Sequence, residues 1–280
     1  MSADDLNTHG ASWRQWILDN LKRGCLPNDM YLTMVKEVWA PDAALSALEA
    51  GQALLGRTTE GMQYFPSIAP GDRFEVDGAN IEVLSRMERP RCSLIGGLLS
   101  PLECLELIAY ANSKGLIASS VVDSATGQEV SHSGRTSRSV FMSRAETPLI
   151  DTLEKRLAKL TNWPLTHAEG LQVLSYEPGQ QYKPHFDWFD PENPGSAIHL
   201  CHGGQRVSTT VIYLSAADIG GRTVFPNAGY EVSPPVGGAI FFRDVDALGK
   251  PDNMSLHAGT PVENGVKIVA TYWQRESSFQ

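Results

Sequence analysis

The sequence predicts an α+β protein in which helices come first and an antiparallel β-sandwich or jelly roll follows. Two observations support this order. Apolar residues recur at helical spacing early in the 280-residue chain, whereas many short apolar segments, separated by Gly- and Pro-rich joints, follow Trp163. Helices and strands do not alternate along the chain, so a doubly wound parallel sheet is not expected.

The first 56 residues are expected to form two or three short helices. Ser12 and Gln15 have the spacing of a capping box, and Pro41 suits the first turn of a later helix. The apolar positions of the first helix are Trp13, Trp16, Ile17 and Leu21. Two hypotheses are open for this region. Either its Trp and Leu faces pack on the rest of the protein, or Trp13 and Trp16 help to recognise a partner or to join two chains.

The remainder divides into a linker and a larger domain. Residues 57–90 contain several Pro and Gly breakers, so we expect a linker with short strands such as 80–84. From residue 91 the pattern changes to a strand at 92–98 and a helix that starts at Ser100-Pro101-x-Glu103 and ends near Lys114. A second helix starts at Thr147-Pro148. The predicted division is therefore 1–56, 57–90 and 91–280.

The β-rich part is expected to contain eight strands. They are predicted at 170–176, 182–186, 205–214, 223–225, 230–233, 238–243, 254–258 and 267–274. Each is short and is bounded by turn residues, which is typical of antiparallel sandwiches and jelly rolls.

Composition excludes several classes of protein. With 32 acidic and 23 basic residues the formal net charge is -9, which argues against nonspecific nucleic-acid binding because phosphates require an excess of Lys and Arg. No apolar run reaches the roughly 20 residues that span a bilayer. The four cysteines form no CxxC pair, and the polar, acidic residues 1–9 do not resemble a signal peptide. A cytoplasmic protein is expected, with no membrane or nucleic-acid partner.

The clearest chemical motif is the run Lys183-Pro184-His185-Phe186-Asp187. On a strand, residues i and i+2 share one face, so His185 and Asp187 would be presented side by side. His257, on another expected strand, is a candidate third ligand. Two His and one carboxylate on one face are typical of non-haem Fe(II) oxygenases. An isolated His-x-Asp pair is also common in solvated turns, so the motif depends on its neighbours.

Two further features bear on this hypothesis. His199 and His202 form a His-x-x-His pair with Cys201 between them, which offers zinc as an alternative metal, although the segment is Gly-rich and lacks a second cluster. Lys267 lies in an apolar strand, where a buried ammonium needs a counter-charge. A dicarboxylate co-substrate bound to the metal by its other end would supply that charge.

Seen together, these segments resemble the prolyl 4-hydroxylase family of Fe(II)/2-oxoglutarate-dependent dioxygenases. The resemblance covers roughly residues 92–275. The segments that carry it are GLQVLSY at 170–176, GQQYKPHFD at 179–187, GGQRV at 203–207, YL at 213–214, GGRTVFP at 220–226, SLHAGTPV at 255–262, Lys267 and Trp273. Residues 1–56 lie outside it, and Ser139 stands where the family often has a glycine.

The resemblance implies a double-stranded β-helix core with flanking helices, preceded here by the N-terminal helical extension. It implies a role for each of ten residues. The implied iron ligands are His185, Asp187 and His257; the implied 2-oxoglutarate contacts are Lys267, Tyr176 and Thr223; and the implied substrate-side residues are Tyr182, Arg206, Arg135 and Trp273. Arg135-Thr136-Ser137 matches a mobile loop that covers the substrate.

The implied reaction is hydroxylation of an unactivated C–H bond with Fe(II), 2-oxoglutarate and O2, releasing succinate and CO2. The expected substrate is a prolyl residue in a protein or peptide. Because Ser139 and the N-terminal region depart from the family, hydroxylation of a free amino acid or small natural product is an alternative. A non-catalytic binding module is a third. The oligomeric state and any need for ascorbate are left open.

Overall fold

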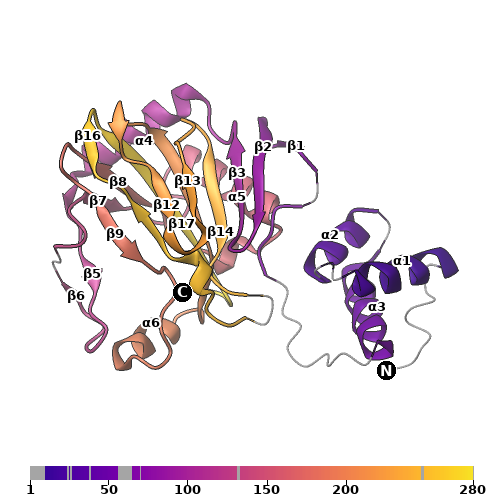
Figure 1. Ribbon diagram of the computed structural model, residues 1–280. Helices are drawn as coiled ribbons and strands as arrows, with labels where there is room; N and C mark the ends of the chain where they lie inside the picture. Colours follow the sequence, from indigo (N-terminus) through magenta and orange to yellow (C-terminus); the bar gives the residue numbers. More distant parts are fainter. Residues whose placement is uncertain are drawn as a thin grey trace.

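The computed structural model of this protein describes residues 10–23, 25, 27–37, 39–55, 65–69, 71–130, 133–246 and 249–279. Three helices come first: α1 (Ala11–Lys22), α2 (Pro27–Glu37) and α3 (Pro41–Leu54). Figure 1 shows them grouped together beside the β-rich part of the chain, which contains the remaining elements. No helix among the described residues is both long and apolar enough to span a membrane.

The expected N-terminus of α1 was wrong. The helix begins at Ala11 with Gly10 as its N-cap, so Ser12 lies within the first turn and makes no capping bond. A capping side chain must come from a residue outside the helix in extended conformation. Gln15 instead donates a hydrogen bond to Asp19, one turn further along, at 2.8 Å.

The three helices pack on one another around their own apolar core. Ile17, Leu21 and Met34 are buried there. The Trp13 ring meets those of Trp16 and Trp39 edge to face, with centroids 5.2 and 5.9 Å apart. The tryptophan side chains therefore pack against one another within the helical segment, and not against the sheets as the first hypothesis expected. A role in recognising a partner stays a prediction.

One large antiparallel sheet supports the β-rich part. In spatial order its strands are β1 (Arg73–Val76), β2 (Ala79–Glu88), β3 (Arg91–Gly96), β14 (Ala239–Arg243), β10 (Arg206–Ser215), β17 (Lys267–Arg275), β8 (Gln172–Tyr176), β7 (Arg138–Phe141) and β4 (Ile117–Ala118). β1 and β2 lie within the expected linker and extend this sheet, because β2 pairs with β3 and β1 pairs with β2. The stretch 73–88 is thus part of the sheet, while the division of the chain into domains stays a prediction.

A second, four-stranded sheet contains β13 (Tyr230–Val232), β12 (Thr223–Phe225), β15 (His257–Gly259) and β9 (Tyr182–His185), in that order. Two further two-stranded sheets pair β11 (Ile219–Gly220) with β16 (Val262–Asn264) and β5 (Val121–Val122) with β6 (Glu129–Val130). Apolar residues from both larger sheets, among them Tyr213, Phe225 and Phe242, form a shared core. The two sheets therefore face each other, as Figure 1 shows, and the predicted jelly roll is confirmed.

Alternate residues of the main sheet point to its other face, where two helices cover them. Ile212 and Phe241 pack there with side chains of α4 (Pro101–Lys114) and α5 (Pro148–Thr161). The predicted capping box of α4 is confirmed, since the Glu103 N–H donates to Ser100 Oγ and the Ser100 N–H donates to Glu103. The helices hold the main sheet from behind and leave its front face for the second sheet.

Candidate metal centre and active site

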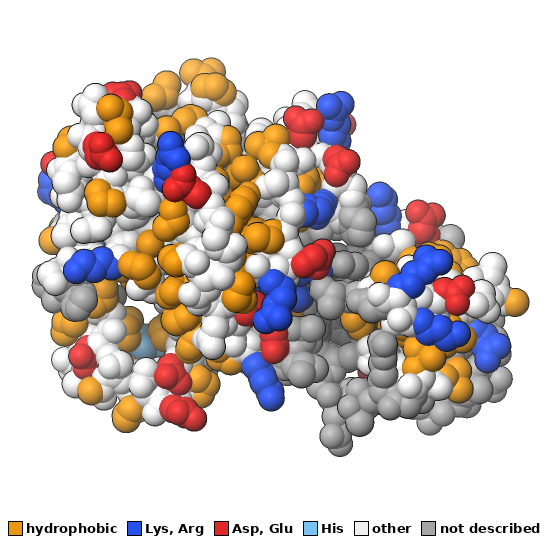
Figure 2. All heavy atoms as spheres, in the orientation of Figure 1, with side chains coloured by type: hydrophobic (Ala, Val, Ile, Leu, Met, Phe, Trp, Pro, Cys, Tyr) orange, Lys and Arg blue, Asp and Glu red, His pale blue; other side chains and the backbone are white. Residues whose placement is uncertain are grey.

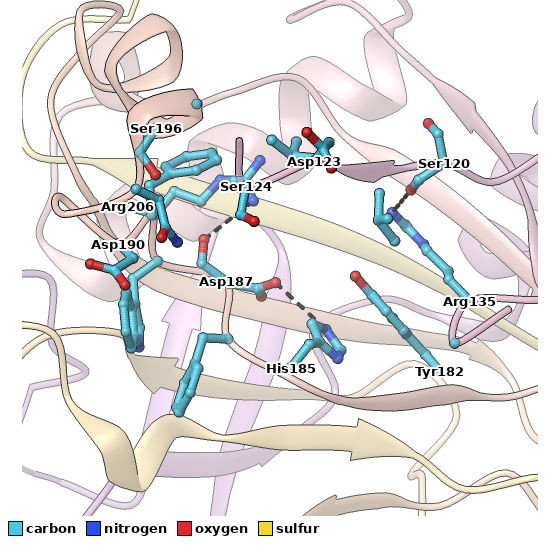
Figure 3. Close-up of a pocket in the computed structure, with 18 of the residues that line it drawn as sticks. Ser120, Asp123, Ser124, Arg135, Tyr182, His185, Asp187, Asp190, Ser196 and Arg206 are labelled. Carbon is cyan, nitrogen blue, oxygen red and sulfur yellow. Dashed lines mark hydrogen bonds and ion pairs between the residues drawn. The ribbon is translucent and has the colours of Figure 1, made fainter. Parts of the chain in front are cut away.

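Three potential metal ligands meet at one end of the second sheet. His185 ends β9, and His257 begins β15 directly opposite it in the strand register. Asp187 lies between their imidazoles: its Oδ1 is 3.7 Å from His185 Nε2 and its Oδ2 is 3.6 Å from His257 Nε2. Figure 3 shows Asp187 and His185 facing each other. These are the only three His, Cys, Asp or Glu side chains among the described residues that are grouped closely enough to hold a metal ion.

Backbone carbonyls set the orientation of both imidazoles. His185 Nδ1 lies 2.8 Å from the Lys183 carbonyl, and His257 Nδ1 lies 3.0 Å from the Ser255 carbonyl. A carbonyl can only accept, so each Nδ1 carries the proton and each Nε2 presents a lone pair toward the centre. This is the hydrogen-bonded arrangement that metal-binding histidines adopt.

The electrostatics also fit a cation. Burial, together with the neighbouring His257, lowers the pKa of His185 to about 3, so its imidazole is neutral at pH 7. Burial would raise the pKa of the Asp187 carboxyl, but His257, His185 and Arg206 hold it below its ordinary value. Divalent metal binding requires neutral imidazoles and an ionised carboxylate, and the pKa shifts of His185 and Asp187 favour these states.

The structure corrects the reason given for two of these positions. β9 ends at His185, so Asp187 lies just beyond the strand and not on its face. The strand expected at 254–258 starts only at His257, because the preceding Asn253–Ser255 form a 3-10 turn. The turn places His257 at the very start of β15, and the chain after β9 folds Asp187 back toward it.

A small cavity leads from the three ligands to Lys267. Lys267 begins β17, is 4% exposed and forms no ion pair within the described part of the chain. Its Nζ lies 5.6 Å from the ring centroid of Tyr176, its partner in the strand register. Burial lowers the pKa of Lys267 to about 8. A buried ammonium without a counter-charge at the end of a cavity is suited to binding an anionic group.

Tyr176 and Thr223 line the same cavity, as their expected role requires. Thr223 lies on β12 opposite Gly259, and its Oγ1 is 3.0 Å from the hydroxyl of Tyr213. Gly259 faces Lys267: a Cβ built there would lie 3.7 Å from the ammonium. The cavity therefore carries hydroxyl groups beside the Lys267 ammonium.

A larger cavity of about 660 Å³ opens beside His185 and Asp187. Its walls come from β5, β7, the chain that follows β9, and the segment 193–196, and they include the aromatic side chains of Phe141, Trp188 and Phe189. Figure 3 shows Ser120, Ser124 and Ser196 around this space, with His185 and Asp187 at its base. In Figure 2 a hollow is visible at the lower left, with histidine atoms inside it. The cavity gives a large substrate access to the metal centre.

Arg206 lies in the wall of this cavity, but its charge is already paired. Its guanidinium forms a two-point ion pair with Glu169, at 2.7 and 2.8 Å, and stacks 4.0 Å from the ring of Trp273. The Arg206 guanidinium also lies 4.8 Å from the centroid of the Phe189 ring. Glu169 was not recognised in the sequence, because it precedes a strand with no motif around it. With Glu169 present, Arg206 adds little net attraction for the co-substrate, and Lys267 is the main cation of the site.

Arg135 and Tyr182 line both cavities. The Arg135 guanidinium lies 4.8 Å above the Tyr182 ring, and it donates hydrogen bonds to the Ser120 carbonyl and to Gln172 Oε1. Gln172 in turn donates to Ser139 Oγ at 3.2 Å. Ser139, the departure from the family pattern, is therefore part of a buried chain of hydrogen bonds that supports Arg135. Gln172 was not identified from the sequence.

The zinc alternative finds no support in the geometry. His199 Nε2 lies 2.9 Å from the Gly127 carbonyl and stacks on Phe189, so this nitrogen donates a hydrogen bond. His202 is exposed, and Cys201 Sγ donates to the carbonyl of Ile198. The side chains of this segment are used to join it to the β5–β6 loop and to the cavity wall.

Comparison with known proteins agrees with this geometry. The family model of the 2OG-Fe(II) oxygenase superfamily matches residues 171–275. Probable prolyl 4-hydroxylase 3 of Arabidopsis thaliana is 38% identical over 218 residues, which cover 71% of this chain and 73% of that protein. Prolyl 4-hydroxylase 1 of the same plant is 38% identical over 204 residues, covering 68% and 70%.

A similar structure has also been solved. It is the viral collagen prolyl hydroxylase of Paramecium bursaria Chlorella virus-1 in complex with 2OG, 33% identical to this chain, with a TM-score of 0.53 over 65% of this chain and 94% of that one. The likeness confirms the double-stranded β-helix core. This protein belongs to the prolyl 4-hydroxylase family of Fe(II)/2-oxoglutarate-dependent dioxygenases.

Proposed function

We propose that this protein hydroxylates a prolyl residue in a protein or peptide, using Fe(II), 2-oxoglutarate and O2 and releasing succinate and CO2. One observation carries the proposal: His185 and Asp187 line both a small cavity, which they share with His257 and Lys267, and a large cavity that opens to the surface. The small cavity suits a dicarboxylate that reaches the metal, and the large one suits a peptide segment.

The residues present fit the expected groups. Both imidazoles present Nε2 lone pairs and Asp187 supplies a carboxylate, so these three would hold Fe(II) and leave positions open for other ligands. Bound iron, with 2-oxoglutarate and O2, supplies the oxidising chemistry. Lys267 would bind the distal carboxylate of 2-oxoglutarate, with Tyr176 and Thr223 beside it. These contacts orient the co-substrate and exclude water from its distal end.

On the substrate side, Tyr182, Arg135, Arg206 and Trp273 would position the target residue over the metal. Arg135 and Arg206 are each held rigidly by two or more polar contacts, and both stack on aromatic rings. A pre-formed wall of this kind lowers the entropy cost of binding an extended peptide. The similarity to prolyl 4-hydroxylases favours a prolyl target. Ascorbate is expected to keep the iron ferrous during repeated turnover, and a cytoplasmic location stays a prediction.

The substrate proposal predicts a specific product. Proline-containing peptides incubated with the protein, Fe(II), 2-oxoglutarate and O2 are expected to gain one oxygen atom on a prolyl residue, with one succinate released per hydroxylation. Mass spectrometry with fragment assignment measures the first, and an enzymatic succinate assay the second. The control is the same peptide set with each proline replaced by alanine. Oxygen transfer to free amino acids, with none to any peptide, would favour the small-molecule alternative instead.

The buried position of Lys267 predicts how 2-oxoglutarate binding depends on pH. Its pKa of about 8 in the free protein means that the ammonium is charged below that pH and neutral above it. A bound carboxylate stabilises the charged form, so binding above pH 8 must take up a proton. Affinity is therefore expected to be nearly constant below about pH 7.5 and to fall almost tenfold per unit above about pH 8.5.

Calorimetric titration of the Mn(II)-loaded protein with 2-oxoglutarate across this range measures the effect. Mn(II) is chosen because it does not start turnover. The Lys267→Met variant is the matched control, because its weaker binding should lack this dependence on pH. An affinity that rises or stays level from pH 7 to pH 9.5, in a protein whose fold is unchanged, contradicts the assigned role.

A further inference from the structure

Two buried polar residues behind the metal ligands have no role in the function described so far. Thr209 lies on β10 and Asp244 follows β14, and neither side chain is exposed to solvent. Thr209 Oγ1 is 2.8 Å from Asp187 Oδ2 and also 2.8 Å from Asp244 Oδ2. The hydroxyl thus bridges a metal ligand and a second carboxyl group that lies deeper in the protein.

Counting protons determines how this bridge must be arranged. Each of the two short oxygen–oxygen contacts needs one proton, and a threonine hydroxyl has one to donate. An ionised carboxylate can only accept, and Asp187 must be ionised to bind a divalent cation. Thr209 therefore donates to Asp187, and the proton in the other contact belongs to Asp244. The geometry requires Asp244 to be a neutral carboxylic acid that donates to Thr209.

The surroundings of Asp244 agree with a neutral side chain. Its other oxygen, Oδ1, is buried and has no hydrogen-bond partner within the described residues. An ionised carboxylate in that position would leave its charge poorly compensated. Burial, and the negative charge of Asp187 nearby, raise the pKa of Asp244 well above its ordinary value.

We propose that Asp244 and Thr209 are positioning residues for Asp187, in which neutral Asp244 donates to Thr209 and Thr209 donates to Asp187 Oδ2. This proposal rests on the proposed role of Asp187 as an iron ligand. With Oδ2 engaged, Asp187 presents Oδ1, which lies 3.7 Å from His185 Nε2, to the metal. The carboxylate is thereby held as a one-oxygen ligand, which keeps the remaining positions free for 2-oxoglutarate and O2.

We call the two hydrogen bonds from Asp244 to Thr209 and from Thr209 to Asp187 the relay. Calorimetric titration of the metal-free protein with Mn(II) alone tests this relay without turnover. Thr209→Val keeps the shape of the side chain but removes the hydroxyl, and it is expected to weaken Mn(II) binding by about 10-fold or more, the usual effect of losing an outer partner of a ligand. Thr209→Ser should restore binding. Thr210→Val is the matched control, because the neighbouring Thr210 hydroxyl is buried and makes no hydrogen bond with the described residues.

Asp244 variants separate a neutral donor from a charged group. Asp244→Asn retains a neutral N–H donor toward Thr209, so Mn(II) affinity should stay within about threefold of the parent, whereas Asp244→Ala should lower it by more than that. If Thr209→Val does not fold, as judged by circular dichroism, this second pair still decides the question. Parent-like binding by both Thr209→Val and Asp244→Ala would overturn the relay, and a large loss in Asp244→Asn would overturn the neutral form of Asp244.

Failure of the relay can be told apart from failure of the metal site itself. His257→Ala should remove Mn(II) binding whether or not the relay exists. If the parent protein binds no Mn(II), or if His257→Ala binds it equally well, the proposed function is wrong. If His257→Ala loses binding while both Thr209→Val and Asp244→Ala retain it, only the positioning role of Thr209 and Asp244 is wrong.

Discussion

Replacing His257 with alanine is expected to abolish both metal binding and hydroxylation. The variant loses one of three ligands, and the two that remain, His185 and Asp187, lie 3.7 Å apart on one side of the centre. The loss of affinity should exceed the roughly 10- to 100-fold that follows removal of an outer partner of a ligand. Inductively coupled plasma spectrometry of iron after dialysis, together with succinate release, measures the two effects.

His202→Ala is the matched control, because His202 is exposed and does not belong to the group of side chains that could hold the metal ion. It should bind iron and turn over as the parent does. Because His257 is buried and its ring lies 4.7 Å from that of Phe242 in the shared core, circular dichroism of His257→Ala must show that the fold is retained. Retained iron with normal succinate release in His257→Ala would contradict the assignment of the metal centre.

Replacing Lys267 with methionine is expected to raise the KM for 2-oxoglutarate by about 30-fold or more, because removing one partner of a buried charge pair costs about 2–5 kcal/mol of binding free energy. The Mn(II) affinity of the variant should stay near that of the parent, since Lys267 is at the far end of the small cavity from the three ligands. Steady-state kinetics in 2-oxoglutarate and Mn(II) calorimetry measure the two quantities.

Thermal unfolding distinguishes this effect from damage to the fold. Without 2-oxoglutarate, Lys267 is a buried cation with a pKa lowered by desolvation, so its charge at pH 7 opposes folding. Methionine has a similar length and no charge, and the melting temperature of the variant without co-substrate should equal or exceed that of the parent. Lys155→Met, at an exposed ion pair on α5, controls for loss of a lysine and should leave KM unchanged. A parent-like KM in Lys267→Met would remove Lys267 from the site.

Local sequence signals predicted structure well where all the groups involved are neighbours in the chain. Ser100 and Glu103 are three residues apart, and their capping box is formed as expected. The same pattern at Ser12 was misleading, because that helix starts at Ala11, two residues earlier than a cap at Ser12 would place it. A capping pattern states which groups can bond but not where the helix begins.

The candidate metal ligands were chosen from residue type, spacing and family resemblance, although the local geometry differed from the expected one. Asp187 lies past the end of β9, and His257 follows a 3-10 turn. Both side chains nevertheless reach the same point, because β9 and β15 pair in a register that places His257 opposite His185. The sequence contains the ligands, whereas the pairing of strands 72 residues apart brings them together.

What the sequence by itself determined is the order of elements and the jelly-roll class, because these follow from short-range patterns. It also supplied candidates for the metal ligands and for the buried lysine, through residue type and through the resemblance to a known family. Only the tertiary structure decided which partners these residues have. Glu169 neutralises Arg206, Gln172 supports Arg135, and Thr209 links Asp187 to Asp244. The physical reason is that hydrogen bonds and charge pairing act across a few ångströms of space, here between residues that the chain separates by 22 to 37 positions.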